Sequence, residues 1–242
     1  MPPGTGASFV GLNNNAYQLE RAKTHTRDVQ SLCSFILGDY MQIPEGDESY
    51  DAVIAIESMP HAPDKTAAFR EIFRVLRPGG FFGGYDWCLT EAFDAQDTKH
   101  LRVKTDIMRG NGLPDIALTA EVGTSLEMAG FELTDARDRA AESDPGMSWY
   151  RPLQGRDLGF RGIPRTPVGR ALTNLALRAG EKLQVVPEGT RAVSTFLNRA
   201  ADSLVEGGET GIFTPLFYFL ARKPRDGEAV PREAAPPETS RQ

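Results

Sequence analysis

The sequence predicts an α/β fold in which a parallel sheet carries helices on both faces. Short apolar runs of strand length alternate with segments of helical character along most of the chain, and this alternation is typical of a parallel sheet. Between 140 and 211 the alternation is interrupted by prolines and two helices, which predicts a helical insertion before the last strand. The strand candidates are 9–12, 34–38, 50–57, 81–87, 131–138 and 211–223.

The segments between these strands are predicted as helices from composition, caps and spacing. Residues 17–23 are good helix formers, and Asp64 is placed to cap a helix whose apolar side chains recur at helical spacing from Phe69. A helix over about 119–129 ends at Gly130, as helices commonly do at glycine. The insertion holds helices near 168–183 and 190–205, the second with an apolar face made of Val193, Phe196, Leu197, Ala200 and Leu204.

Two of the strand candidates are expected to be buried. The first, around Phe9, Val10 and Leu12, is predicted as a short buried strand. The third, 50–57, is almost continuously apolar, which predicts a strand covered on both faces. The turn residues Pro78, Gly79 and Gly80 are expected to precede the strand at 81–87.

Composition and charge exclude several classes of function. The 242 residues are 40% hydrophobic and 25% charged, ordinary values for a globular chain long enough to bury a sizeable core. The net charge of −6 and the scattered basic residues argue against nucleic acid as a partner, because phosphate contacts need clustered lysine and arginine. Cys33 and Cys88 are too few for a disulfide framework and lack metal-ligand spacing, which favours a reducing compartment such as the cytoplasm.

Neither a transmembrane segment nor a secretory signal is expected. The longest apolar run, 212–221, is about half the length of a membrane-spanning helix and contains Pro215. Met1 is followed by proline and glycine rather than by the basic and apolar residues of a signal peptide. The segment from 224 is rich in proline, glutamate and arginine, so we expect it to be disordered.

Polar and aromatic side chains follow four of the predicted strands. Ligands bind at the carboxyl ends of parallel strands, so the candidates are Asn13, Asn14, Asn15 and Gln18, then Asp39, Tyr40 and Met41, then Glu57 to His61, and finally Tyr85, Asp86 and Trp87. Each group also has a simpler interpretation as a polar turn, a loop acid, surface polar residues or core aromatics. Glu57 and His61 lie four residues apart, but Pro60 excludes a regular helix there, so helical metal-ligand geometry is not expected. The recurrence of such groups at one edge of the sheet favours a ligand site.

Five stretches, in their order along the chain, resemble the sterol 24-C-methyltransferases. They are GLNNNAYQLERAK, GDYMQIP, YDAVIAIESMPHAPD, FREIFRVLRPGGFFGGYDW and IFTPLFYFLARKP. The resemblance covers about 8–224, and the helical insertion is similar to the C-terminal region of that family. RVLRPGG occurs in many class I methyltransferases, whereas GLNNN together with the Glu57-to-Pro63 block is much more specific. The resemblance implies a Rossmann-like class I methyltransferase fold and transfer of a methyl group from S-adenosylmethionine to a sterol.

The resemblance also implies which residues hold the cofactor. Asn13, Asn14, Asn15 and Gln18 would lie near its ribose and methionine portions, where amides can both accept and donate hydrogen bonds. Asp39 would accept from the adenine amino group, with Tyr40 and Met41 packed on the ring. Glu57, Ser58 and His61 would flank the methyl donor and the sterol side chain. Pro60 is a departure from the family's pattern within that block.

The implied reaction requires alignment of two reactants and no metal. The sulfonium is already an activated donor, so the enzyme chiefly supplies proximity and excludes water. Methyl attack by the alkene leaves a carbocation, a hydride shift relocates it, and a proton is then lost. Tyr85 and Trp87 are the candidates to contact the sterol and stabilise the cation, and Glu57, His61 and Asp86 are the candidate catalytic residues that accept the proton. The family has Tyr-Glu-Trp where this chain has Asp86 between the two aromatics.

The family's first strand and its glycine-rich loop have no counterpart before residue 8. In the class I order that strand lies at the centre of the sheet, so we expect two unpaired edges, an uncovered apolar face and poor cofactor binding by these residues alone. The expected parts are an incomplete cofactor-binding domain at 1–139, a sterol methyltransferase C-terminal region at 140–223 and a tail at 224–242.

Two other functions stay open at this stage. One is a non-catalytic homologue that acts as the partner of an intact subunit, and the other is a methyltransferase of another prenyl lipid or phenol. A sterol substrate implies work near the endoplasmic reticulum, with peripheral membrane association and homo-oligomer formation both left open.

Overall fold

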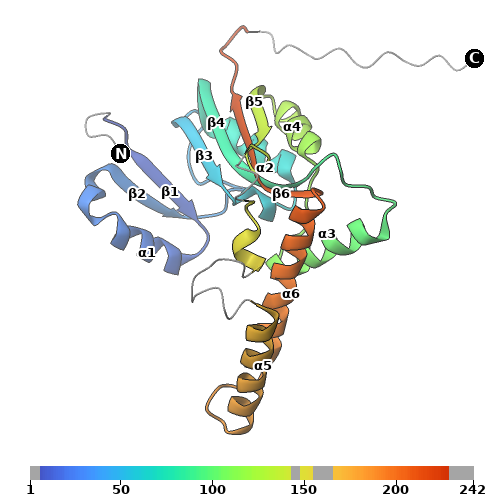
Figure 1. Cartoon of the computed structure of the whole chain (residues 1–242). Helices are drawn as coiled ribbons and strands as arrows, with labels where there is room; N and C mark the ends of the chain where they lie inside the picture. The colour runs from blue at the N-terminus through green and yellow to red at the C-terminus, as the bar shows by residue number, and fades with distance from the viewer. Residues whose placement is uncertain (1–5, 143–147, 155–165, 229–242) are drawn as a thin grey trace, which may run out of the picture.

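The computed structural model describes residues 6–142, 148–154 and 166–228. These residues form a four-stranded sheet, a separate two-stranded sheet and a projecting helical hairpin (Figure 1). The strands are β1 (Phe9–Asn13), β2 (Cys33–Leu37), β3 (Tyr50–Ile56), β4 (Leu76–Leu89), β5 (Glu132–Asp138) and β6 (Phe213–Arg222). The α-helices are α1 (Ala16–His25), α2 (Lys65–Val75), α3 (Thr98–Asn111), α4 (Thr119–Met128), α5 (Pro167–Lys182) and α6 (Thr190–Glu209). Short 3-10 turns are η1 (Arg27–Leu32), η2 (Met59–His61) and η4 (Arg151–Gln154).

The predicted strands and helices are confirmed, with two differences. Helix α3 has no counterpart among the predicted helices, because its sequence is largely polar and only Val103 and Ile107 are buried. Strand β4 begins at Leu76, five residues earlier than predicted. The expected turn at Pro78, Gly79 and Gly80 lies within the strand, where the pairing with β3 shifts register.

The four-stranded sheet has the order β3-β4-β6-β5 and is mixed, so the prediction of a parallel sheet was wrong for its last strand. Strand β3 is parallel to β4, but β6 is antiparallel to both of its neighbours. The cause is the insertion, because α6 ends beside the carboxyl end of β4, where Thr90 N–H donates to the Ile212 carbonyl at 3.0 Å. From that end the chain can only re-enter the sheet in the opposite direction.

A cluster of aromatic rings fills the core on one face of this sheet. The side chains of Phe69, Phe82, Phe131 and Phe219 are fully buried, and the rings of Phe82 and Phe219 lie 4.9 Å apart between centroids. Helices α2 and α4 cover this face, and α3 and α6 pack on the other face near the carboxyl end of β4. Asp64 caps α2 by accepting from Ala67 N–H at 2.9 Å, as predicted. The expectation of helices on both faces is therefore confirmed.

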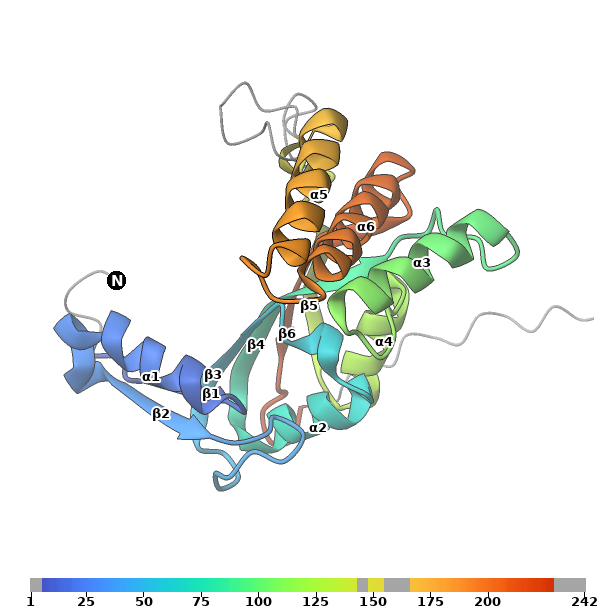
Figure 2. The same ribbon diagram turned by 90° about the horizontal axis from the view of Figure 1, so that it is seen from below.

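Strands β1 and β2 form a parallel pair that is not hydrogen-bonded to the larger sheet. With α1 they stand beside β3 as a separate layer (Figure 2). The two unpaired edges expected from the sequence are present within the described residues, on β1 and on β3. The predictions of a buried first strand and of a third strand covered on both faces were wrong, because these edges leave Val10 39% exposed and Ile54 70% exposed.

Helices α5 and α6 form a hairpin that projects away from the carboxyl edge of the sheet (Figure 1). Only part of the predicted apolar face of α6 is covered, because Ala200 is buried whereas Val193 and Leu197 are each 58% exposed. Within the described ranges, none of the helices combines the length and the apolar character needed to cross a membrane. The tail predicted from 224 lies outside the described residues after 228.

Candidate functional site

A polar cavity of about 640 Å³ opens at the carboxyl ends of β1 and β3. Every residue predicted to hold the cofactor lines it: Asn13, Asn14, Asn15, Gln18, Asp39, Tyr40, Met41 and Glu57. Ser58 and His61 line it as well. Residues from three separate sequence blocks therefore meet in one place, as expected for side chains that follow neighbouring parallel strands.

The three asparagines have different structural roles at the turn from β1 into α1. The Asn13 amide accepts from Asn15 N–H and donates to Gln18 Oε1, both at 2.8 Å. Asn15 is the N-cap of α1 and accepts from Gln18 N–H. Asn14 takes no part in this network and lies exposed in the lining of the cavity. The turn interpretation therefore explains two of the asparagines, and the ligand interpretation suits the third.

The segment after β2 places one acid beside two large side chains. One Asp39 carboxylate oxygen accepts from Met41 N–H at 2.8 Å, which fixes the carboxylate at the cavity wall and leaves its second oxygen for a ligand donor. Tyr40 and Met41 also pack against the core of the larger sheet. Burial, with the charges of Asp39 and Asp86, raises the pKa of the Tyr40 phenol, so this ring stays neutral at pH 7.

The end of β3 has an unusual backbone. Glu57 has a φ of 52°, in the left-handed region that few residues other than glycine occupy. Its N–H donates to the Tyr85 carbonyl at 3.1 Å, which ties this conformation to β4. Backbone strain of this kind persists where the surrounding structure enforces it, and it is concentrated at functional sites.

Glu57 precedes the short 3-10 turn η2 and His61 is the last residue of that turn, so the two do not share one face of a regular helix. Pro60 lies within η2 and is buried with Met59, so the prediction that no regular helix forms there is confirmed. Glu57 and His61 are both exposed toward the cavity. Among the described residues, no group of three or more His, Cys, Asp or Glu side chains is arranged to hold a metal ion.

Asp86 is placed differently from the other candidate catalytic residues. Its side chain is fully buried and forms an ion pair with Lys65 at 2.6 Å. Lys65 Nζ also donates to the Met59 carbonyl at 2.9 Å, so the pair joins β4 to the turn that carries His61. Burial raises the pKa of Asp86, and the Lys65 ammonium opposes that rise. Lys65 was not predicted, since only the folding of α2 against β4 brings it to the carboxylate.

Tyr85 and Trp87 lie on the face of β4 opposite to Asp86 and do not line the polar cavity. The Tyr85 ring packs 5.5 Å from that of Tyr218, and the Trp87 ring packs edge-on against Phe213 at 5.6 Å. The buried indole N–H of Trp87 has no hydrogen-bond partner within the part of the chain that the structure describes. Trp87 packs in a cluster with Trp149 and Leu204 of the helical insertion, whereas the ring contact of Tyr85 is with β6.

Comparison with known families agrees with this arrangement of site and insertion. A methyltransferase domain matches residues 3–83, which contain the cavity, and a sterol methyltransferase C-terminal region matches residues 160–225. A cycloartenol-C-24-methyltransferase of Arabidopsis thaliana is 43% identical over 89% of this chain, and a sterol 24-C-methyltransferase of Yarrowia lipolytica is 40% identical over 92%. The chain is similar to the sterol 24-C-methyltransferases along most of its length. It spans 64% and 60% of the lengths of these two relatives.

Solved structures place this chain in the class I methyltransferase fold. A geranyl diphosphate C-methyltransferase from Streptomyces coelicolor A3(2), in complex with S-adenosyl-L-homocysteine, matches with a TM-score of 0.59 over 90% of this chain and 64% of its own, at 15% identity. The [4+2]-cyclase SpnF matches with a TM-score of 0.58 over 90% of this chain and 67% of its own, at 22% identity. Because a cyclase shares the fold, the fold alone does not determine the reaction.

Proposed function

We propose that this chain carries the cofactor site and sterol-facing region of an S-adenosylmethionine-dependent sterol C-24 methyltransferase. The observation that carries the proposal is the convergence of the Asn13–Asn15 turn, Asp39 and Glu57 on one cavity, in a chain whose relatives are sterol 24-C-methyltransferases. The reaction transfers the methyl group from the sulfonium of S-adenosylmethionine to the side-chain alkene of a sterol.

The proposed cofactor contacts follow from the hydrogen-bonding capacity left open in the cavity. Asn14 and Gln18 would meet the ribose and methionine portions, while the second Asp39 oxygen would accept from the adenine amino group. Tyr40, which lines the cavity beside Asp39, would pack against the adenine ring. The carboxylates of Asp39 and Glu57 give the cavity the negative charge that suits a cationic sulfonium.

The proposed catalytic residues are Glu57 and His61. Both lie exposed in the cavity, within the segment that closes the carboxyl end of β3, so either can reach a proton on the rearranged carbocation. Asp86 would act by holding the η2 turn through Lys65, because its carboxylate is buried in the ion pair. Tyr85 and Trp87 would face the sterol from the side of the helical insertion, where their rings can stabilise positive charge.

Equilibrium dialysis of a longer form of the protein with radiolabelled S-adenosylmethionine tests the cofactor site. We expect Asp39→Asn to weaken binding about tenfold, since hydrogen bonds to charged groups contribute about 1.5–3 kcal/mol. Asp94→Asn is the matched control, because Asp94 makes the same type of bond, to Gln96 N–H at 2.8 Å, outside the cavity. Equal effects of the two substitutions would contradict the assignment.

Methyl transfer to a sterol with a side-chain alkene, assayed in a longer form of the protein that turns over, tests the catalytic assignment. Glu57→Gln should lower turnover about 100-fold or more, because removal of a general base typically costs that much. Glu91→Gln, a change at an exposed position outside the cavity, serves as the control. Turnover of Glu57→Gln close to that of the control would remove Glu57 from the mechanism.

We further propose that the protein works at the surface of the endoplasmic reticulum membrane, where sterols reside. The loop between α5 and α6 supports this, since Leu183 is 73% and Val185 77% exposed. Three cations, Arg178, Lys182 and Arg191, lie around this loop together with two acids, Glu181 and Glu188. Apolar tips flanked by cations suit an anionic bilayer surface. Co-sedimentation with phosphatidylserine vesicles should decrease when Val185 is changed to Asp, and unchanged sedimentation would contradict this surface.

A further inference from the structure

Residues 38–49 connect β2 of the smaller sheet to β3 of the larger one and carry one wall of the polar cavity. That wall contains Asp39, Tyr40 and Met41. No strand pairing joins the two sheets within the described residues. The position of this wall relative to the end of β3 therefore depends on how the connecting segment is held.

Arg74, near the end of α2, holds this segment with its whole guanidinium. Two of its hydrogen bonds go to the carboxylate of Glu71, from Nε at 3.0 Å and from Nη2 at 2.7 Å. The others reach into the segment, to the Ile43 carbonyl at 3.0 Å, the Glu45 carbonyl at 2.9 Å and Asp47 Oδ1 at 2.7 Å. Every N–H donor of the guanidinium is thereby used, and its planar shape fixes the directions of all these bonds.

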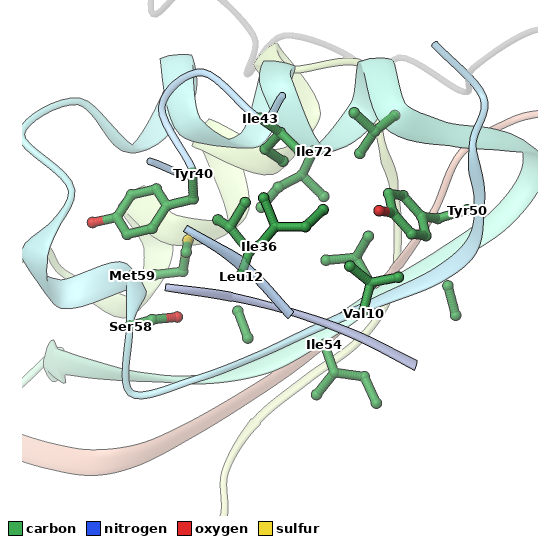
Figure 3. A pocket seen from close by; sticks show the side chains of 14 residues that line it. Val10, Leu12, Ile36, Tyr40, Ile43, Tyr50, Ile54, Ser58, Met59 and Ile72 are labelled. Carbon is green, nitrogen blue, oxygen red and sulfur yellow. The ribbon is translucent and has the colours of Figure 1, made fainter. Parts of the chain in front are cut away.

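Glu71 completes the attachment by binding the other polar backbone group of Ile43. Its Oε1 accepts from Ile43 N–H at 2.8 Å, so side chains of α2 bind both the N–H and the carbonyl of this residue. Hydrogen bonds from Arg74 lower the pKa of Glu71, so its carboxylate is ionised at pH 7 and both oxygens accept. Figure 3 shows the Ile43 side chain beside that of Ile72, which also belongs to α2, in the lining of an apolar cavity of about 170 Å³.

A short turn connects Ile43 to the cavity wall. Gln42 N–H donates to the Asp39 carbonyl at 3.0 Å, and Met41 N–H donates to the Asp39 carboxylate at 2.8 Å. Ile43 follows Gln42 directly, so the attachment of Ile43 to α2 determines where this turn lies. The place of the Asp39 carboxylate in the cavity wall follows from the place of the turn.

We infer that Arg74 and Glu71 are positioning residues for the adenine end of the cofactor. They hold the Asp39 carboxylate where it can distinguish an amino group from a carbonyl oxygen on the base. Neither side chain lines the cavity, so both act through residues 39–43 and do not touch the cofactor. The inference rests on the proposed function, because it takes the polar cavity as the S-adenosylmethionine site.

The experiment compares the binding of S-adenosylhomocysteine and S-inosylhomocysteine, by equilibrium dialysis of a longer form of the protein. The second compound has a carbonyl oxygen in place of the adenine amino group, so it cannot donate to Asp39. We expect the wild type to bind the first compound at least about tenfold more tightly. Arg74→Met should reduce this ratio to about threefold or less, because the carboxylate is no longer held at the base. A general loss of stability would weaken both compounds equally and leave the ratio unchanged.

Arg77→Met is the matched control for this substitution. Arg77 lies three residues further along the chain and forms an ion pair with Asp51, which lies outside residues 38–49, so its loss should leave the ratio as in the wild type. Glu71→Gln, which keeps the size of the side chain but removes its charge, should lower the ratio in the same direction as Arg74→Met.

Hydrogen exchange measured by mass spectrometry tests the attachment in the present chain without any cofactor. The amides of residues 41–43 each donate a hydrogen bond in this arrangement. In Arg74→Met and in Glu71→Gln these amides should exchange at least about tenfold faster than in the wild type. Exchange at residues 82–86, which are paired within the larger sheet, should stay unchanged and verifies that the variants fold.

Unchanged exchange at residues 41–43, or a ratio in both variants equal to that of the wild type, would overturn the inference. Packing of Tyr40 and Met41 against the core would then position the wall without Arg74. Equal affinity of the wild type for the two compounds would also overturn it, since Asp39 would not contact the base. No binding of either compound by the wild type would refute the proposed cofactor site, and the exchange of residues 41–43 would then decide alone whether Arg74 and Glu71 hold the segment.

Discussion

The β1–β2 pair and the four-stranded sheet are built from similarly apolar strands but bury them to different extents. In the larger sheet, β4 and β6 have a partner on each side, and the rings of Phe82 and Phe219 are fully buried under α2 and α4. In the smaller sheet, Phe9, Val10 and Leu37 are all more than a third exposed, and α1 contributes only Leu19 to the buried core. The difference shows that apolar strands stabilise the fold only when neighbouring strands pair with both of their edges and helices cover one of their faces.

One cysteine lies in each sheet. The rates at which their thiols are labelled should show the largest difference between the two sheets. Cys33 lies partly exposed in β2, whereas Cys88 lies buried in β4, where burial and the Asp86 charge raise the pKa of its thiol. With iodoacetamide, a Cys88→Ser variant should be labelled at Cys33 about 1,000-fold faster than a Cys33→Ser variant is labelled at Cys88. Reaction of Cys88 requires opening of the core, at a cost of about 5 kcal/mol or more.

The same labelling in concentrated urea is the control for intrinsic reactivity, since both thiols should then react at similar rates. Similar rates in the native protein would mean that the two sheets open together, which would contradict the comparison.

Removal of one aromatic ring from each sheet should lower the free energy of unfolding by different amounts. Phe82→Ala should lower the free energy of unfolding by about 3–5 kcal/mol, because it leaves a cavity among Phe69, Phe131 and Phe219. Phe9→Ala, at a position 37% exposed, should cost less than about 1 kcal/mol. Urea unfolding followed by circular dichroism measures both changes, and equal losses would show that β1 is as well packed as β4.

The buried ion pair between Asp86 and Lys65 joins the larger sheet to the candidate site, and a substitution of Lys65 tests its contribution to stability. Lys65→Met should lower the free energy of unfolding by about 3 kcal/mol at pH 7, because it leaves the buried Asp86 carboxylate without its partner. Lys99→Met, an exposed position on α3, is the matched control and should change little.

The pH dependence of this effect has a definite sign. Burial raises the pKa of Asp86 above its ordinary value of 3.8, and the loss of Lys65 removes the main opposing influence, so the pKa rises further in the variant. A raised native pKa means that the folded state binds the proton more tightly than the unfolded state does. The resulting stability is therefore present at low pH and is lost as the pH rises through the native pKa.

The difference in the free energy of unfolding between the wild type and Lys65→Met should therefore become smaller as the pH is lowered from 7 toward 4. Urea unfolding at several pH values measures it. A deficit that stays constant or grows on acidification would show that Asp86 is not the group responsible.

Much of the fold could be predicted from local sequence. The cap at Asp64, the glycine stop at Gly130 and the apolar runs of the strands define most elements, because caps and periodicity act within a few residues. Helix α3 was missed because few of its side chains are apolar, and it is held by burial of Val103 and Ile107 against other elements. The antiparallel direction of β6 depends on where α6 ends, which no local pattern contains.

By itself, the sequence determined the class of the fold, the family resemblance and the candidate residues at the strand ends, because these depend on residue type and spacing along the chain. Only the tertiary structure decided that Asn13 and Asn15 stabilise a turn, and that Asp86 pairs with Lys65. It also showed that Val10 of β1 and Ile54 of β3 remain exposed beside unpaired strand edges of the described residues. Burial, pairing and free edges are properties of elements brought together in space, so they appear only once the chain has folded.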